Sequence, residues 1–195
     1  MQVESDKVNK LALANLKTPV LDLGCFKGDK TAFLNKHFEH AEGCDISLNA
    51  LVKATEKFPE IRFTQYDYEK ENMSERIKFN SIFCTKVIEH VFDVQAFLKN
   101  CNASLNENGI LFLTTPNVKS FLNRIRLLFG DETNFKIETG HLRFFTPETI
   151  SKELEQAGFE IVLIDGYNVR PVVERLWFPL NFYEGIIVVA KKMRE

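Results

Sequence analysis

Short apolar runs alternate along most of the chain with segments in which apolar residues recur at helical spacing. The first run, PVLDLGC, is interrupted by one aspartate only, which is typical of a strand buried on both faces of a parallel sheet. Such runs predict strands at 19–25, 41–46, 61–67, 79–88 and 110–116. The segments between them predict helices at 28–38, 47–58, 69–77 and 92–105. This alternation predicts a parallel, doubly wound sheet with helices on both faces.

The C-terminal part of the chain departs from this alternation. The segment TPETISKELEQAG predicts a helix with Thr146 as N-cap, Pro147 in its first turn and Gly158 at its end. Two apolar runs at 159–168 and 185–192 then follow without a helical segment between them. Such a pair is expected to be antiparallel, so the predicted fold is α/β with a seven-stranded mixed sheet that is mostly parallel.

A chain of 195 residues without a linker or an internal repeat predicts one domain spanning 1–195, with a core at 18–165 and closing strands to 192. Within it, the segment NVKSFLNRIRLLFG at 117–130 has the pattern of an amphipathic helix. We expect 117–145 to form a cap over an active site. Covering the sheet, a dimer contact and a membrane-surface contact are the alternatives.

Charge and cysteine spacing exclude several classes of protein. A net charge of −2 gives no overall field that would attract nucleic acid, and a small molecule is the expected partner. The charged N-terminus resembles neither a signal peptide nor an anchor, and no apolar run reaches the length of a membrane span. Four widely spaced cysteines predict reduced thiols, a cytoplasmic protein and no metal site. A homodimer is one assembly that the sequence allows.

A glycine-containing loop joins the first predicted strand to the first predicted helix. In VLDLGCFKGDKT the pattern is Asp22-x-Gly24-x-x-x-Gly28, with Asp29 as a candidate helix cap. Glycines there let the backbone approach a ligand closely, so a nucleotide-like ligand is expected at the carboxyl edge of the sheet. The loop lacks the G-x-G-x-x-G spacing of dinucleotide binders, and a plain strand-to-helix turn would also use two glycines.

Acidic residues end the next two predicted strands. Asp45 closes the second strand, where a carboxylate can accept hydrogen bonds from both hydroxyls of a ribose. Asp67 closes the third and could receive an adenine amino group, while Tyr68 or Ile46 would supply apolar contact to the base. A helix cap or a solvated turn is the alternative for either aspartate alone.

With these residues in place, the chain resembles the class I S-adenosylmethionine-dependent methyltransferases, and within them the small methyltransferases related to ubiquinone- and methionine-biosynthesis proteins. The resemblance covers about 18–165 and rests on VLDLGCFKGDKT, CDIS, TQYDY, FNSIFCTKVIEHVFD and GHLRFFTPETISKELEQAGFE. It implies a Rossmann-like fold, S-adenosylmethionine as cofactor and methyl transfer to an unidentified small-molecule acceptor.

The resemblance also assigns residues to the cofactor. It places the methionine part against Asp22, Gly24 and Gly28, with Cys25 in the same loop, the ribose on Asp45 and the adenine near Asp67 and Tyr68. Lys86, Val87 and Ile88 would line the methionine and methyl side. The family's middle glycine is Phe26 here. A bulky side chain at that point must project away from the cofactor or crowd it.

Methyl transfer from a sulfonium requires alignment of the acceptor, exclusion of water and in some cases removal of a proton. The candidate bases are His90, in IEHV, and His141, in GHLRFF. The place of His141, between the predicted cap and the helix that starts at Thr146, favours it. A hydrogen bond that only stabilises the loop is the alternative for both.

Two other functions also fit parts of this sequence. A non-catalytic protein with this fold could act as a binding or regulatory partner, which the phenylalanine in the glycine loop would permit. An NAD-dependent dehydrogenase would share the strand, loop and ribose aspartate, but the glycine spacing needed at a pyrophosphate is missing.

Overall fold

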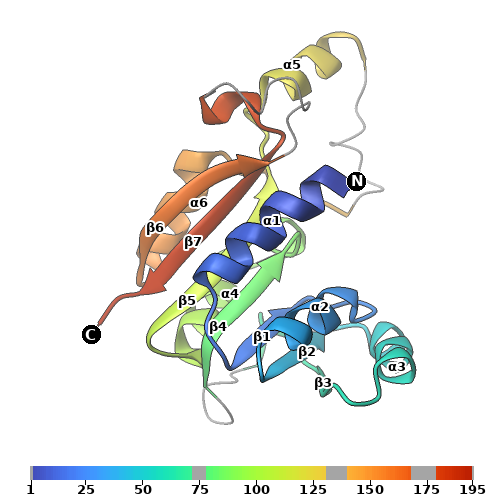
Figure 1. The fold of residues 1–195 in the computed structure, drawn as a ribbon. Coiled ribbons are helices and arrows are strands. Elements are labelled where there is room, and N and C mark those ends of the chain that lie inside the picture. The colour runs from blue at the N-terminus through green and yellow to red at the C-terminus, as the bar shows by residue number, and fades with distance from the viewer. Residues whose placement is uncertain (1, 72–77, 131–139, 168–178, 195) are drawn as a thin grey trace.

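The computed structural model describes residues 2–71, 78–130, 140–167 and 179–194. Seven strands form one sheet in the order β3-β2-β1-β4-β5-β7-β6 (Figure 1). The strands are β1 (Val20–Leu23), β2 (Ala41–Asp45), β3 (Phe63–Gln65), β4 (Phe79–Thr85), β5 (Leu105–Pro116), β6 (Phe159–Tyr167) and β7 (Gly185–Lys192). The first five pair in parallel, whereas β7 is antiparallel to both β5 and β6. The predicted seven-stranded, mostly parallel sheet is confirmed.

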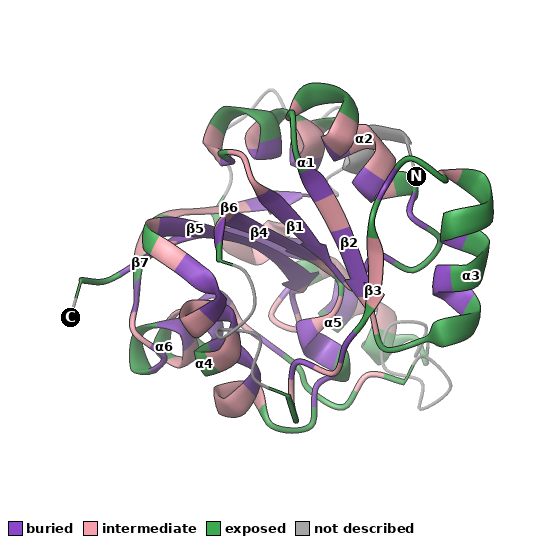
Figure 2. Ribbon diagram, turned by 90° about the horizontal axis from the view of Figure 1, so that it is seen from below, coloured by how far each residue is buried: buried purple, intermediate pink, exposed green. Residues whose placement is uncertain are grey.

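Helices cover both faces of this sheet (Figure 2). They are α1 (Gln2–Asn15), α2 (Asp29–His37), α3 (Leu48–Lys57), α4 (Val94–Ser104), α5 (Phe121–Leu128) and α6 (Pro147–Gln156). Residues of α1 and α2 belong to one buried cluster, and residues of α4 and α6 belong to the other. The predicted doubly wound arrangement is therefore confirmed.

Alternation along the central strands supplies the two clusters. Phe83 of β4 and Phe112 of β5 are register partners whose rings stack 5.3 Å apart in the cluster under α1 and α2. Ile82 and Cys84 lie on either side of Phe83 in the sequence and point to the opposite cluster. Each central strand is therefore buried on both faces. Because the first five strands are parallel, their carboxyl ends lie at the same edge of the sheet.

The N-terminal helix α1 is an element that the sequence analysis missed. Val8, Ala12 and Leu16, four residues apart, are buried in the cluster that α2 also joins. Lys7 additionally forms an ion pair of 2.9 Å with Asp165 of β6. The four-residue periodicity of this stretch indicates a helix.

The sequence predicts the N-cap of α6 correctly and that of α2 wrongly. Thr146 caps α6 in a reciprocal capping box with Thr149, and Pro147 is its first residue, as expected. Asp29 is not a cap: Gly28 occupies the N-cap of α2 in the left-handed conformation, and Asp29 instead pairs with Lys57.

Two predicted segments lie partly outside the described residues. Of the helix expected at 69–77, the stretch 72–77 is outside, and of the cap expected at 117–145, the stretch 131–139 is outside. All four cysteines are free thiols in buried positions. Within the described parts of the chain, every helix is too short or too polar to cross a membrane.

Candidate active site

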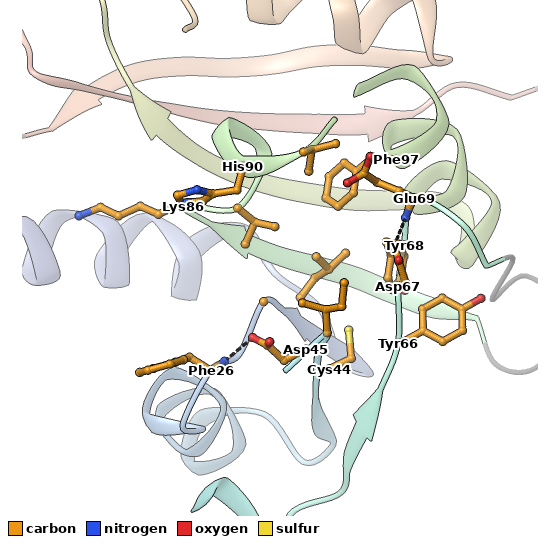
Figure 3. Close-up of a pocket in the computed structure, with 15 residues that line it drawn as sticks. Phe26, Cys44, Asp45, Tyr66, Asp67, Tyr68, Glu69, Lys86, His90 and Phe97 are labelled. Atoms are coloured by element: carbon orange, nitrogen blue, oxygen red, sulfur yellow. Dashed lines mark hydrogen bonds between the residues drawn. The ribbon is translucent and has the colours of Figure 1, made fainter. Parts of the chain in front are cut away.

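A pocket of about 360 Å³ opens at the carboxyl ends of β1, β2 and β4 (Figure 3). Loops that follow these strands supply most of its wall. The lining residues are Leu23, Gly24, Phe26, Cys44, Asp45, Ile46, Tyr66, Asp67, Tyr68, Glu69, Lys86, Val87, His90, Val91 and Phe97. Of the residues assigned to a cofactor from the sequence, Gly24, Asp45, Ile46, Asp67, Tyr68, Lys86 and Val87 are therefore in the wall.

The glycine loop lies closely against the loop after β4. Gly24 has a φ of 78°, and a Cβ built on it would lie 2.2 Å from Cγ2 of Val87. Gly28 has a φ of 79°, and a Cβ there would lie 2.7 Å from the ring of Phe63. Only glycine meets both demands, the left-handed backbone and the close approach, at these two positions.

Phe26 keeps the backbone conformation that a glycine would adopt. Its φ is 49°, in the left-handed region that is costly for a bulky residue. Its N–H donates to Oδ2 of Asp45 at 2.8 Å, and the residue is 59% exposed. The ring projects from the rim of the pocket, beside the ammonium of Lys27 at 5.1 Å, rather than into its floor.

Asp45 ends β2 with its carboxylate fixed from two sides. Oδ2 accepts the N–H of Phe26, and Oδ1 accepts the N–H of Ser47 at 2.8 Å. Each oxygen keeps lone pairs beyond the one that its backbone partner uses. The side chain can therefore still accept hydrogen bonds from the pocket side.

Acidic residues after β3 organise the opposite end of the pocket. Oδ1 of Asp67 accepts the N–H of Glu69 at 3.0 Å, and Oδ2 pairs with Lys70 at 3.1 Å. Glu69 in turn uses Oε1 to accept the N–H groups of Phe92 and Asp93, at 3.0 and 2.7 Å. Asp67 thus shapes a turn, and Glu69 ties that turn to the start of α4.

Three residues that the resemblance assigned to the methionine part lie outside the pocket wall: Asp22, Cys25 and Gly28. Asp22 is only 2% exposed, and its Oδ2 accepts the hydroxyl of Thr31 at 2.6 Å. Burial raises the pKa of Asp22 to about 7 and that of the Cys25 thiol to about 12. These residues support the loop from behind.

The two candidate bases meet beside the pocket, but only His90 lines it. Their rings are 5.0 Å apart. Nδ1 of His90 lies 2.9 Å from the carbonyl oxygen of Gly140. A carbonyl oxygen can only accept, so Nδ1 carries a proton and Nε2 of the neutral ring is the basic nitrogen.

Glu89 connects the two histidines to the sheet. Its carboxyl is buried, Oε2 accepts the hydroxyl of Thr115 at 3.3 Å, and burial raises its pKa. Its backbone carbonyl accepts the N–H groups of Leu142 and Arg143, at 2.8 and 3.0 Å. The segment that carries His141 is thereby held against the loop that carries His90.

Glu89 and the two histidines are also possible metal ligands. In the described parts of the chain, Glu89, His90 and His141 form the group whose ligand atoms could hold a metal ion, because they all lie within 4.8 Å of one another. Carboxylate and imidazole are ordinary metal ligands. The transfer of a sulfonium methyl group does not require a metal, so the site's chemistry is derived from the side chains themselves.

The lining also contains residues that sequence analysis missed. They are Leu23, Cys44, Tyr66, Glu69, Val91 and Phe97. The first three adjoin assigned strand-end residues and could have been found by extending each strand-end motif by one position. Glu69 and Val91 likewise adjoin the assigned Tyr68 and His90, whereas Phe97 carries no such signal, because its position depends on how α4 packs.

The buried Asp22 carboxyl makes stability depend on pH. Its ordinary pKa is 3.8, whereas the folded protein retains the proton up to about pH 7. Between these values the folded state binds more protons than the unfolded chain, so the free energy of unfolding falls as the pH rises. Asp22→Asn removes this titration and keeps an acceptor oxygen for Thr31.

We expect the free energy of unfolding of the parent, relative to Asp22→Asn, to fall by on the order of 4 kcal/mol as the pH rises through this window. Urea titrations of both proteins at about pH 4, 5.5 and 7.5 measure this difference. A difference that stays constant with pH would contradict the raised pKa.

Comparison with known proteins identifies the family. Residues 3–164 match a family model described as a methyltransferase domain. The ubiquinone biosynthesis O-methyltransferase of Coxiella burnetii is 27% identical over 161 residues, which cover 78% of this chain and 68% of that protein. The protein of the same name from Glaesserella parasuis is 26% identical over 202 residues, with 93% and 84% covered.

Solved structures agree on the fold. Magnesium protoporphyrin IX methyltransferase from Synechocystis, solved with bound S-adenosylhomocysteine, superimposes with a TM-score of 0.71 at 19% identity, covering 96% of this chain and 81% of that chain. The family model spans most of the chain. The chain thus belongs to the methyltransferase domain family, as a class I S-adenosylmethionine-dependent methyltransferase.

Proposed function

We propose that this enzyme binds S-adenosylmethionine along the pocket and transfers its methyl group to a hydroxyl oxygen of a small-molecule acceptor. The observation that carries the proposal is the Asp45 carboxylate, which two backbone N–H groups orient at the end of β2. In a doubly wound sheet, this position suits recognition of ribose hydroxyls. A pocket wall of mixed aromatic, acidic and basic side chains accommodates the remaining parts of the cofactor.

The cofactor's orientation follows from the two ends of the pocket. Tyr68 and Phe97 pack their rings 6.2 Å apart at the end where Asp67 and Glu69 lie, and we assign the adenine to this end. The methionine part then runs over Gly24 toward Val87. Bound in this direction, the cofactor supplies an activated methyl group near His90.

Two observations support a hydroxyl group as the methyl acceptor. Both relatives described above are O-methyltransferases by name. In this chain, Nε2 of His90 is the basic nitrogen at the pocket wall, and it can accept the proton that a hydroxyl loses as its oxygen bonds to the methyl carbon. The carbon–sulfur bond breaks in the same step, and the proton remains on the imidazole.

We also propose that the chain is one domain in which 117–145 caps the acceptor side. The base of this segment is held by Asn117, which donates to the carbonyl oxygens of Leu180 and Tyr183 at 3.1 and 3.0 Å. Its far end at 140–143 is bonded to the loop of His90. A cytoplasmic location, the lack of a nucleic-acid partner and a homodimer stay predictions.

The ribose assignment is tested by thermal unfolding with S-adenosylhomocysteine. A ligand that binds only the folded state raises its stability, by about 2.7 kcal/mol at a hundred times its Kd. We expect millimolar S-adenosylhomocysteine to raise the Tm of the parent, NAD to leave it unchanged, and Asp45→Ala to lose most of the shift. Glu60→Ala, on the surface away from the pocket, is the matched control.

Absence of a shift in the parent would remove the binding proposal, and a shift with NAD alone would favour a dehydrogenase. Binding without formation of S-adenosylhomocysteine from S-adenosylmethionine, across a panel of phenols and alcohols, would favour the non-catalytic alternative.

Phe26 is expected to support cofactor binding. Its ring lines the pocket rim and is largely exposed, so a bound cofactor would cover part of it and bury apolar surface. We expect Phe26→Gly to weaken S-adenosylhomocysteine binding about fivefold, while the left-handed backbone becomes strain-free and offsets the added chain entropy. Isothermal titration calorimetry measures the affinity. Tighter binding in the variant would show instead that the ring crowds the cofactor.

The base is expected to be His90, with His141 as its neighbour. His90→Ala should lower kcat by about 10²-fold on an acceptor found in the phenol panel, the usual scale of one general base, with the Kd of S-adenosylhomocysteine nearly unchanged. His141→Ala, which changes a ring outside the pocket wall, should have the smaller effect. A larger loss of kcat in His141→Ala than in His90→Ala would assign the base to His141. Full activity of both variants would show that the enzyme acts by aligning the acceptor, without a general base.

A further inference from the structure

A polar side chain is completely buried directly after the end of β5. Asn117 uses its Nδ2 to donate to the carbonyl oxygens of Leu180 and Tyr183, at 3.1 and 3.0 Å. Its Oδ1 accepts the N–H of Lys119 at 3.0 Å. Both N–H groups of the amide are thus used within the protein, and the residue is not part of the wall of the cofactor pocket. Its side chain therefore holds other parts of the chain in place.

The backbone of Asn117 makes further connections. Its N–H donates to the carbonyl oxygen of Glu184 at 2.8 Å, and its carbonyl oxygen accepts Nδ2 of Asn123 in α5 at 2.9 Å. It also forms an isolated parallel bridge with Phe145. One buried residue therefore connects the end of β5 with α5, with the segment at 180–184 and with the segment that ends at Phe145.

Two of these elements also contact each other beyond the carboxyl end of β5. In Figure 1, α5 lies beside the short helix η4 (Leu180–Phe182). The rings of Phe121 in α5 and Phe182 in η4 are 5.6 Å apart. Arg126 of α5 forms an ion pair with Glu184. The two helices thus form one unit, which meets the sheet at the turn after β5.

The third element carries one of the two candidate bases. The bridge made by Asn117 reaches the segment of His141, whose ring lies 5.0 Å from that of His90. Thr115, two residues earlier in β5, donates to the carboxyl of Glu89, which precedes His90. The end of β5 therefore holds both segments that carry a histidine, and Asn117 fixes α5 relative to them.

We infer that Asn117 is a positioning residue for binding of the methyl acceptor. It fixes α5 and the segment of His141 as one wall on the acceptor side, without touching the cofactor. The inference rests on the proposed function, in which 117–145 caps the acceptor side. Because enzymes depend on the placement of substrate to within about 1 Å, a small displacement of this wall weakens acceptor binding.

Two control variants separate this role from a general contribution to stability. Asn117→Ala removes all three side-chain hydrogen bonds. Asn102→Ala matches it in chemistry, because Nδ2 of Asn102 donates to the carbonyl oxygens of Ala157 and Gly158, at 3.1 and 2.9 Å, at the opposite edge of the sheet. Ser120→Ala matches it in place, because the buried Oγ of Ser120 has no hydrogen-bond partner among the described residues.

The readouts are the KM and kcat for a phenol of the panel, the Kd of S-adenosylhomocysteine and the Tm. We expect Asn117→Ala to raise the KM of the acceptor about tenfold, while kcat and the Kd change by less than about threefold. Asn102→Ala should lower the Tm as Asn117→Ala does but leave the KM unchanged, and Ser120→Ala should change neither. Asn123→Ala, which frees α5 only from the Asn117 carbonyl, is the milder variant and should raise the KM less.

An unchanged KM in folded Asn117→Ala would overturn the inference, as would an equal rise in Asn102→Ala, which would make lost stability the cause. A Kd of S-adenosylhomocysteine that weakens as much as the KM rises would assign Asn117 to the cofactor site and so also overturn it. If Asn117→Ala does not fold, an unchanged KM in Asn123→Ala overturns the inference. A parent that binds no S-adenosylhomocysteine, or methylates no acceptor of the panel, shows instead that the proposed function has failed.

Discussion

The carboxylate of Asp45 is the point on which the geometry of the site depends. With one oxygen it holds the N–H of Phe26, in the left-handed turn after β1, and with the other it holds the N–H of Ser47, which caps α3. One side chain therefore fixes the relative position of a glycine loop, a strand end and a helix start. Because both backbone donors are satisfied by the same group, a change in its charge or length affects all three elements together.

On the other side of the pocket, the loop after β4 performs a similar task with backbone groups. Gly140, Leu142 and Arg143 bond to His90 and to the carbonyl of Glu89. The two walls differ in how they are held, since one depends on a charged side chain and the other mainly on main-chain hydrogen bonds. The segment at 140–143 is thus held against the sheet by Glu89 and by His90, the candidate base.

Much of the fold was predictable because buried strands and amphipathic helices leave clear periodicities. The seven strands and the cap of α6 at Thr146 follow from local patterns alone. Helix α1 was missed although Val8, Ala12 and Leu16 repeat every fourth residue, because its burial depends on a face of the sheet assembled from distant segments. Aspartate is a common N-cap residue, which predicts Asp29 as the cap, but the left-handed Gly28 occupies that position.

The site was predictable where it follows from strand ends and not where it follows from packing. Asp45 ends β2 and Asp67 lies two residues after the end of β3, and parallel strands bring their carboxyl ends to one edge. The hydrogen bonds of Glu69 could not be predicted, because its partners Phe92 and Asp93 are more than twenty residues away and meet it only in the folded protein. Asp22 differs from both: its motif position suggests ligand contact, and in the fold its carboxyl is buried and accepts the hydroxyl of Thr31.

The position of β7 has a consequence for how the chain can fold during its synthesis. This strand comes last among the seven yet lies between β5 and β6, pairing with both. Until it leaves the ribosome, β5 and β6 have no common partner, and the long apolar edge of β5 is unpaired. Five parallel strands can assemble in chain order, but closure of the sheet must wait for the final strand. A chain that lacks β7 would expose this edge to pairing with other chains.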